Sequence, residues 1–249
     1  MILCFDCGNT SIKIGLFENG ELIKVFKLKT DRNKSSDEYA LSISSLVKCE
    51  VEGAIISSVV PLITPLLKKA IKLSFGIEAL ILSKKLKTKM PIKIDNPNEL
   101  GSDMLAGAIG AKDIVSYPFV VADLGTATKL YVVDKNGAFI GGVITAGMQI
   151  SLKALVGNTA QLLETPIIAP SKILGTNTKD CIQSGIVFGQ AYMVSEFARR
   201  IEKELGYELK RVLTGGFAEE IKDEIVCFEY DENLVLKGLY KIYDLNRGI

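Results

Sequence analysis

A short acidic motif occurs twice in this chain, each time behind an apolar run and ahead of an Asn-Gly pair. The first copy, residues 6–10, reads DCGNT and is followed by Asn19-Gly20. The second copy, residues 123–128, reads DLGTAT and is followed by Asn136-Gly137 at the same distance. Asn-Gly between two apolar runs is the strongest short hairpin signal. Each copy therefore predicts a strand, an Asp-x-Gly turn, a strand, a tight turn and a strand. Two copies of one unit are expected to set their loops face to face across a cleft, where a nucleotide could lie.

Composition excludes several classes of function. The chain has 249 residues, of which 48% are hydrophobic and 24% charged, and 30 basic against 29 acidic side chains leave a net charge of +1. This balance offers no electrostatic footprint for nucleic acid or an anionic membrane. No apolar run is long enough to span a bilayer, and we expect the N-terminal residues to form a strand rather than a signal peptide. We therefore expect neither nucleic acid nor a membrane as partner.

The residue types available for chemistry are restricted, because the chain contains no histidine. A Ser-His-Asp triad, a His-activated cysteine and His-ligated zinc are excluded, so proton transfer must fall to Asp, Glu, Lys, Tyr or Cys. The five cysteines are scattered, as expected for a protein of the reducing cytoplasm. Cys4 and Cys7 form a C-x-x-C, but they lie in a predicted strand and turn rather than at a helix start, so we interpret the spacing as incidental.

Periodicity and punctuation predict an α/β chain of two closely packed domains, residues 1–116 and 117–249. The expected helices span residues 36–48, 66–75, 101–115, 148–155 and 178–205, with a short helix after residue 216 and a final helix near the C-terminus. Besides the strands of the two repeats, strands are expected at residues 51–59, 79–82, 211–213 and 225–228.

The first acidic loop has the composition of a phosphate site. Gly8 after a strand lets the backbone present its amides, Asn9 and Thr10 add neutral donors, and Lys13 adds a compact positive charge. The Asp6 carboxylate suits Mg²⁺, which takes oxygen ligands. A plain β-turn explains the same residues, but its duplication in residues 123–126 favours phosphate binding.

Two further segments have both structural and functional explanations. Thr214-Gly215-Gly216 follows a predicted strand and resembles a loop that admits adenosine, although a helix entry needs nothing more. Residues 101–103 begin a predicted helix, where Ser or Asp commonly serves as a cap. Neither a P-loop nor a G-x-G-x-x-G motif is present, which argues against those nucleotide-binding classes.

Taken in order, these motifs resemble the type III pantothenate kinases of the acetate and sugar kinase, Hsp70, actin superfamily. That family carries D-x-G-N-T-x-x-K, N-P-x-x-x-G-x-D-R, D-x-G-T-A-T, G-G-x-I-x-x-G, G-x-N-T with a following S-G, and T-G-G. The matching positions are Asp6, Gly8, Asn9, Thr10 and Lys13; Asn96, Pro97, Gly101 and Asp103; residues 123–128; residues 141–147; Gly175, Asn177, Thr178, Ser184 and Gly185; and residues 214–216. The resemblance covers nearly the whole chain.

The resemblance implies duplicated ribonuclease-H-like domains, with mixed sheets flanked by helices and an interdomain cleft, in a homodimer. It implies ATP-dependent phosphorylation of pantothenate to 4'-phosphopantothenate, the first step of coenzyme A synthesis, with Mg²⁺ and a monovalent cation (K⁺ or NH₄⁺). By position, Asp103 is the expected general base and Asp123 the ligand of the monovalent cation. The expected pantothenate site comprises Gly101, Ser102, Asp103, Met104 and Thr178. The expected ATP site comprises Asp6, Gly8, Asn9, Thr10, Lys13 and Thr126, with Asp6 reaching Mg²⁺ through the phosphates.

Three departures from the family pattern bear on these expectations. Met104 stands where the family has an arginine, which grips a carboxylate at two points as methionine cannot. Ile94 replaces a tyrosine, and residues 129–131 read Lys-Leu-Tyr where the family usually has Thr, Phe and Asp. Met104 and Ile94 fall on the expected pantothenate side and keep two alternatives open: a same-fold kinase for another small hydroxyl substrate, or a non-catalytic nucleotide-binding regulator. Lys129 could compensate for the missing positive charge.

Overall fold

The same five-stranded sheet occurs twice in the computed structural model of this chain, which describes residues 1–248. The first sheet has the order β3-β2-β1-β4-β5, and the second has the equivalent order β8-β7-β6-β9-β10. In each, the first three strands along the chain pair antiparallel, the fourth pairs parallel with the first, and the fifth pairs parallel with the fourth. The repeat predicted from the acidic motifs is therefore a repeat of topology.

The strands of the first sheet are β1 (Ile2–Cys7), β2 (Ser11–Glu18), β3 (Glu21–Lys29), β4 (Gly53–Ser58) and β5 (Leu80–Ile81). Those of the second are β6 (Phe119–Leu124), β7 (Ala127–Val133), β8 (Phe139–Ala146), β9 (Lys210–Thr214) and β10 (Glu229–Tyr230). The turn between β2 and β3 confirms the Asn-Gly prediction, since Asn19 and Gly20 both have positive φ angles, 49° and 94°.

Contacts group the chain into two units, each built on one sheet. Unit 1 comprises residues 1–90 and 95–111 with the C-terminal segment from Leu234, and unit 2 comprises residues 91–94 and 112–233. This grouping differs from the predicted domains at the C-terminal helix, which packs against β1, β2 and β4 instead of the second sheet.

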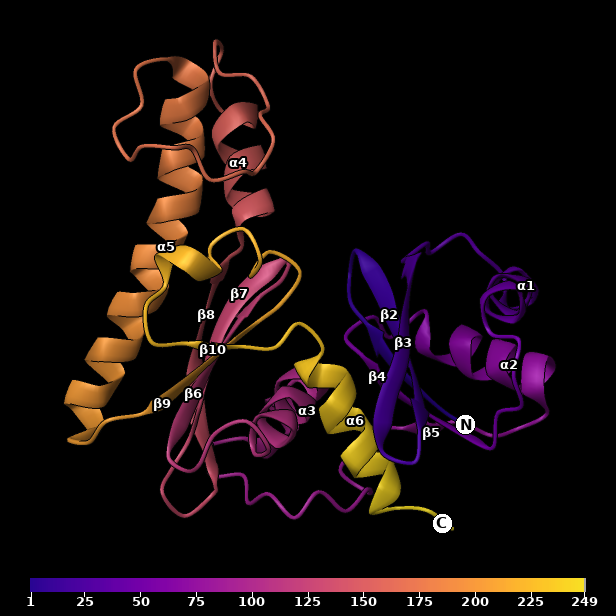
Figure 1. The fold of residues 1–249 in the computed structure, drawn as a ribbon. Helices are drawn as coiled ribbons and strands as arrows, with labels where there is room; N and C mark the ends of the chain where they lie inside the picture. Colours follow the sequence, from indigo (N-terminus) through magenta and orange to yellow (C-terminus); the bar gives the residue numbers. More distant parts are fainter. Residues whose placement is uncertain (249) are drawn as a thin grey trace. The chain divides into compact units, whose positions relative to one another are not determined.

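Unit 1 carries helices on both faces of its sheet (Figure 1). These helices are α1 (Ser36–Leu46), α2 (Thr64–Phe75), α3 (Ser102–Ala111) and α6 (Leu234–Asp244), with a 3-10 turn at Pro97–Glu99. α1 begins with a capping box between Ser35 and Glu38. α2 has Pro65 in its first turn, as predicted, and ends at Gly76 in the left-handed conformation.

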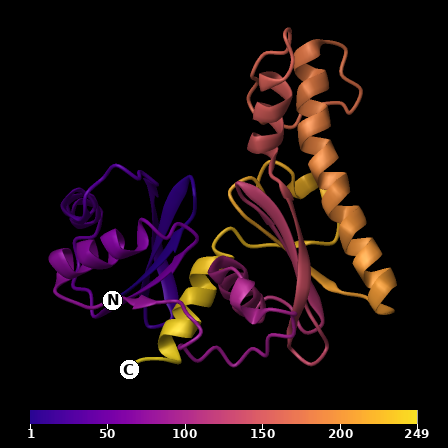
Figure 2. The same cartoon turned by 180° about the vertical axis from the view of Figure 1, so that it is seen from behind.

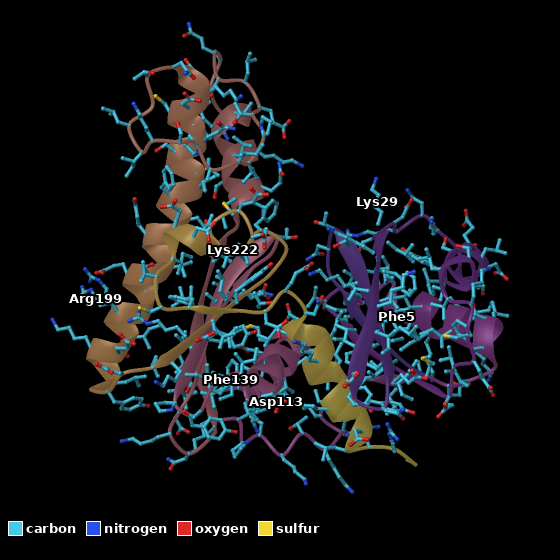
Figure 3. All side chains as sticks on the ribbon, viewed as in Figure 1. Phe5, Lys29, Asp113, Phe139, Arg199 and Lys222 are labelled. Atoms are coloured by element: carbon cyan, nitrogen blue, oxygen red, sulfur yellow. The ribbon has the colours of Figure 1, made fainter. Side chains whose placement is uncertain are left out.

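Side chains of β1 alternate between the two faces of the sheet, and both faces are packed by helices. Leu3 and Phe5, the latter labelled in Figure 3, are fully buried with Ile43 of α1 and Leu67 of α2. Successive side chains of a strand point to opposite faces. Asp6 therefore belongs to the other face of the sheet, the face on which α6 packs.

Unit 2 is dominated by one long helix. Its helices are α4 (Met148–Gly157) and α5 (Thr178–Leu205), with a 3-10 turn at Lys222–Glu224. Val187, Ala191 and Val194 of α5 are buried against Val120 and Ala122 of β6. The two views agree that α4 and the first half of α5 lie side by side beyond the end of the sheet (Figures 1 and 2). We call this part of unit 2, residues 148–192, the helical extension.

Two element predictions differ from the structure. The strand predicted at residues 225–228 is wrong, because the edge strand is β10, where Glu229 pairs with Val212 of β9. Ile225 instead packs into the core of unit 2 from irregular backbone. The helix predicted to reach residue 115 ends at Ala111.

None of the helices within residues 1–248 combines the length with the apolar character that a membrane span requires.

Candidate functional site

The first acidic loop is the turn between β1 and β2, and the end of β3 holds it in place. The Gly8 N–H donates to the Ser11 carbonyl at 3.0 Å. The Thr30 hydroxyl donates to the Gly8 carbonyl at 2.7 Å, and the Thr30 N–H donates to the Thr10 carbonyl at 3.1 Å. Asn9 and Thr10 remain exposed at the tip. The loop thus presents polar groups from a backbone that is fixed on both sides.

The residues that flank this loop face one another across the sheet. Asp6 is opposite Lys13 on β2 and opposite Ser57 on β4. Both Asp6 and Lys13 are half-buried. An acid and a base at one end of the sheet suit a site for a phosphate chain with a bound divalent ion.

A serine pair connects this end of the sheet to α3. The Ser57 hydroxyl is fully buried and donates to the Ser102 hydroxyl at 2.8 Å, while the Ser102 hydroxyl lies 3.4 Å from the Ser58 carbonyl. The pair fixes the first turn of α3 beside Ser57, the β4 residue that is opposite Asp6. Ser57 was missed at the sequence level, although two serines directly after the apolar residues of β4 were a usable signal.

Asp103 lies in the first turn of α3 and is half-buried. Its Oδ1 accepts the Met104 N–H at 2.8 Å. A Cβ on Gly101 would lie 2.7 Å from the same oxygen, so glycine at this position leaves room for the carboxylate. Gly101 and the Met104 backbone therefore both lie beside the Asp103 carboxylate.

Met104, the first departure from the family pattern, is 8% exposed. Its sulfur would lie 3.8 Å from a Cβ on Gly101, so an apolar thioether borders the Asp103 segment. Ile94, the second departure, is half-buried in the short segment of unit 2 whose Lys93 N–H donates to the Phe139 carbonyl at 2.8 Å. Phe139, labelled in Figure 3, stacks on Tyr131 at a centroid distance of 6.0 Å.

The second acidic loop follows β6 in unit 2. The Gly147 N–H donates to the Thr126 carbonyl at 3.2 Å, and the Phe217 N–H donates to the Leu124 carbonyl at 3.0 Å. The end of β8 and the turn after β9 thus bracket this loop. Thr126 is half-buried.

Asp123 forms an ion pair with Lys129, the residue directly opposite it on β7. The Asp123 Oδ2 and Lys129 Nζ atoms are 2.7 Å apart, and the two side chains are only 10% and 14% exposed. The Lys129 ammonium is therefore paired with the carboxylate that was expected to bind a monovalent cation. The donor set at Asp123 does not fit an added cation.

One neighbouring contact escaped the sequence analysis. The buried Gln190 of α5 donates from Nε2 to the Thr128 hydroxyl at 2.6 Å, and Thr128 is 1% exposed. This bond ties the long helix to the strand that carries Lys129. A glutamine on the apolar face of a helix was the available signal.

Thr178 is the first residue of α5, and Asn177 caps the helix by accepting the Asp180 N–H at 2.9 Å. The residues from Thr178 to Gln190 span about 18 Å of helix at a rise of about 1.5 Å per residue. The structure therefore does not bring Thr178 to the Asp123 loop of its own unit.

The C-x-x-C of β1 lies in the interior. Burial raises the pKa of the Cys4 thiol well above its usual value. Burial also raises the pKa of the Cys7 thiol, opposed by a hydrogen bond with Ser58. Both thiols stay protonated near neutral pH and are poor nucleophiles and poor metal ligands.

No group of three or more Cys, Asp or Glu side chains among residues 1–248 could enclose a metal ion. Mg²⁺ commonly binds through one or two carboxylates together with substrate phosphates. The half-buried Asp6 carboxylate beside the glycine turn fits that mode.

Comparison with known proteins agrees with this arrangement. A solved structure described as a conserved putative Baf family transcriptional activator from Campylobacter jejuni is 20% identical, with a TM-score of 0.64, and covers 99% of this chain and 100% of its own. The activator of the 2-hydroxyisocaproyl-CoA dehydratase from Clostridium difficile, with bound ADPNP, is 13% identical with a TM-score of 0.58, covering 98% and 95%. At these identities the likeness concerns the fold alone. The predicted class, α/β with duplicated ribonuclease-H-like units and mixed sheets flanked by helices, is confirmed.

Sequence comparison is more specific. A protein from Acholeplasma laidlawii (strain PG-8A) described as a type III pantothenate kinase is 41% identical over 248 residues, 99% of each chain. The family model for type III pantothenate kinase matches residues 2–200. This chain belongs to the type III pantothenate kinase family.

Proposed function

We propose that this chain transfers the γ-phosphoryl group of ATP to the hydroxyl of pantothenate, giving 4'-phosphopantothenate at the first step of coenzyme A synthesis. Family membership over residues 2–200 supports a phosphotransferase with this acceptor. The observation that carries the proposal is the Asp103 carboxylate, held in the first turn of α3 by the Ser57–Ser102 bond and by the space at Gly101.

We assign Asp103 as the general base. It takes the proton of the pantothenate hydroxyl as that oxygen bonds to the γ-phosphorus and the bond to the β-phosphate oxygen breaks, leaving ADP. The chain has no histidine, and a carboxylate within hydrogen-bond reach of an alcohol can accept this proton. The Met104 N–H orients Oδ1. Positioning and charge neutralisation supply most of the rate in phosphoryl transfer.

We assign the ATP phosphates to Asp6, Gly8, Asn9, Thr10, Lys13 and Thr126. The fixed turn after β1, its exposed Asn9 and Thr10 and the half-buried Lys13 support this assignment. Asp6 would hold Mg²⁺ through the phosphates, and that ion would neutralise charge on the transferred group.

We assign pantothenate to Gly101, Ser102, Asp103, Met104 and Thr178. The buried Met104 is one observation that favours a different small alcohol, because it offers apolar surface where the family has a guanidinium. Retention of Asp6 and Asp103 argues against a non-catalytic regulator.

We also propose a homodimer formed through the helical extension. Apolar side chains are exposed on this extension and the adjoining β8. They are Ile144, Ile150, Leu155, Leu163, Ile168, Ile173, Leu174 and Tyr192. Exposed apolar side chains gathered on one part of a fold are typical of protein interfaces. We further propose a cytoplasmic location, which suits the unpaired thiols of Cys4, Cys7, Cys49, Cys181 and Cys227.

The acceptor is tested by direct product detection. Purified protein is incubated with ATP, Mg²⁺ and either pantothenate or one of a panel of small alcohols, and phosphorylated product is identified by ³¹P NMR and mass spectrometry. We expect 4'-phosphopantothenate, formed faster than any other product. A different alcohol as the preferred acceptor would contradict the assignment to pantothenate, and ATP binding without transfer to any of them would indicate a regulator.

A further inference from the structure

The ion pair at the end of β6 gives the second acidic loop a cation of its own. Asp123 and Lys129 are directly opposite in the antiparallel ladder, their charged atoms are 2.7 Å apart, and both side chains are at least 86% covered. Lys129 carries the positive charge on a strand of the same sheet, so this cation cannot dissociate from the folded chain.

Because the Asp123–Lys129 pair is buried, a second cation is disfavoured beside Asp123. A buried carboxylate needs an opposite charge beside it, and Lys129 meets that need. A second cation at the same carboxylate would share one negative charge with the Lys129 ammonium, and solvent would screen their repulsion poorly at this level of burial. A lysine ammonium is a compact point charge, chemically an alkylated NH₄⁺ ion.

The register of the two sheets indicates that the lysine belongs to the repeat. In unit 1, Asp6 at the end of β1 is opposite Lys13 on β2. In unit 2, Asp123 at the end of β6 is opposite Lys129 on β7. Both halves thus carry an Asp–Lys cross-strand pair beside the acidic loop, whereas the family usually has threonine at the second position.

We propose that the Lys129 ammonium takes the place of the monovalent cation, so that neither ATP binding nor turnover depends on K⁺ or NH₄⁺. The inference rests on the proposed kinase function only for its turnover readout, because cation binding to the folded protein is measurable without substrate. It corrects the expectation that Asp123 binds K⁺ or NH₄⁺.

The first test uses the unaltered chain. ADP is quantified by chromatography, so that no coupling enzyme adds a cation requirement of its own, in tetramethylammonium buffer with and without KCl or NH₄Cl at constant ionic strength. We expect turnover to change by less than about twofold, since a site already neutralised gains little from a further cation. A rise of about tenfold or more on adding K⁺ would overturn the proposal.

The second test restores the family residue. We expect Lys129→Thr to lose about tenfold or more of its turnover in tetramethylammonium buffer and to recover it in K⁺ or NH₄⁺, because the unpaired carboxylate then attracts a free cation. The matched control is Lys210→Thr, which makes the same change at the exposed first residue of β9, where Lys210 pairs with Phe119 at the opposite end of β6. Its turnover should match that of the unaltered chain in every salt.

Thermal unfolding provides a readout independent of catalysis. A ligand that binds only the folded state raises Tm by mass action. K⁺ should raise the Tm of Lys129→Thr and leave the Tm of the unaltered chain and of Lys210→Thr unchanged. A K⁺-dependent Tm in the unaltered chain would refute the proposal even if Lys129→Thr failed to fold. Absence of pantothenate-dependent turnover in every salt would instead contradict the proposed function and leave this Tm test decisive.

Discussion

Asp103 depends on its neighbours for its position. Gly101 leaves the space that Oδ1 occupies, and Ser102 is anchored to the fully buried Ser57 of β4. Met104, which follows Asp103, donates its backbone N–H rather than its side chain to the carboxylate. We therefore expect the proposed function of this carboxylate to be sensitive even to changes that remove no charge.

We predict that Gly101→Ala lowers kcat by about 10- to 100-fold, because a misplacement of about 1 Å in a reacting group can cost that much. The new methyl group would lie 2.7 Å from Asp103 Oδ1 and would displace it. Steady-state kinetics measures the effect. Gly189→Ala is the control, since a Cβ there meets nothing within 4 Å on the exposed side of α5. Equal kcat values for the two variants would show that the carboxylate position does not matter.

At the scale of elements, the connection between β7 and β8 is organised by one carboxylate. The Oδ1 atom of Asp134 accepts the N–H groups of Asn136 at 2.9 Å and Ala138 at 2.8 Å. Burial acts to raise the pKa of Asp134, but these two hydrogen bonds and the Lys93 ammonium together lower it below its usual value. The ionised form is therefore favoured in the folded state.

We predict that Asp134→Ala lowers the free energy of unfolding by about 1–3 kcal/mol at neutral pH, mainly the cost of leaving the buried Ala138 N–H without its acceptor. Because folding lowers this pKa, the ionised contribution is complete above the unfolded value of about 4 and is lost as pH falls through the folded value. Urea unfolding at several pH values should show the difference between the two proteins shrinking in acid. A difference that stays constant from neutral pH into acid would contradict this explanation.

The two helices α3 and α6 approach each other closely at two glycines, Gly110 and Gly238. A Cβ on Gly238 of α6 would collide with the Ala106 carbonyl, and a Cβ on Gly110 of α3 would collide with the Leu234 carbonyl. The two backbones thus touch directly, which groups the C-terminal helix with unit 1.

We predict that Gly238→Val lowers the free energy of unfolding by more than about 2 kcal/mol, because backbone atoms cannot yield as a flexible side chain can. Thermal or urea unfolding measures the loss. Gly185→Val in α5 has open space around its Cβ and serves as the control. If Gly238→Val were no less stable than this control, the close approach of α3 and α6 would be refuted.

The sequence predicted the elements whose signals are local. The duplicated hairpins followed from Asp-x-Gly and Asn-Gly, and α5 begins at Thr178 and ends at Leu205 as its helical character predicted. The two-residue strand β10 was misplaced, because so short a strand is defined by its pairing with β9 and not by its own composition.

The contacts that complete the candidate site were not predictable in the same way. Ser57 meets Ser102, Gln190 meets Thr128, and α6 joins unit 1 only because elements distant in sequence pack together. Lys129 departs from the family pattern in the sequence itself, but only the register of β6 and β7 makes Asp123 its partner.

At the scale of the whole molecule, the exposed apolar side chains of the helical extension lead to a prediction about assembly. We predict that the protein sediments at twice the mass of the chain. Glutamate in place of Leu174, which is 78% exposed, should shift the protein toward monomer because it places a charge in the proposed apolar interface. Analytical ultracentrifugation measures both. Leu41→Glu is the control, at 73% exposure on α1 of unit 1. A monomeric unaltered protein, or dissociation by the control alone, would contradict the proposed interface.

The most direct measurement of the central claim is ADP release with and without pantothenate, for the unaltered chain, Asp103→Asn and Asp37→Asn. Asp37 lies in the first turn of α1, so its variant makes the same change at another helix start. We predict pantothenate-dependent release in the unaltered chain and in Asp37→Asn, and a loss of about 10²- to 10⁴-fold in Asp103→Asn with unchanged Tm, as removal of a general base requires. Pantothenate-dependent release that persists in Asp103→Asn would contradict the assignment of the base, and release that never depends on pantothenate would contradict the proposed reaction.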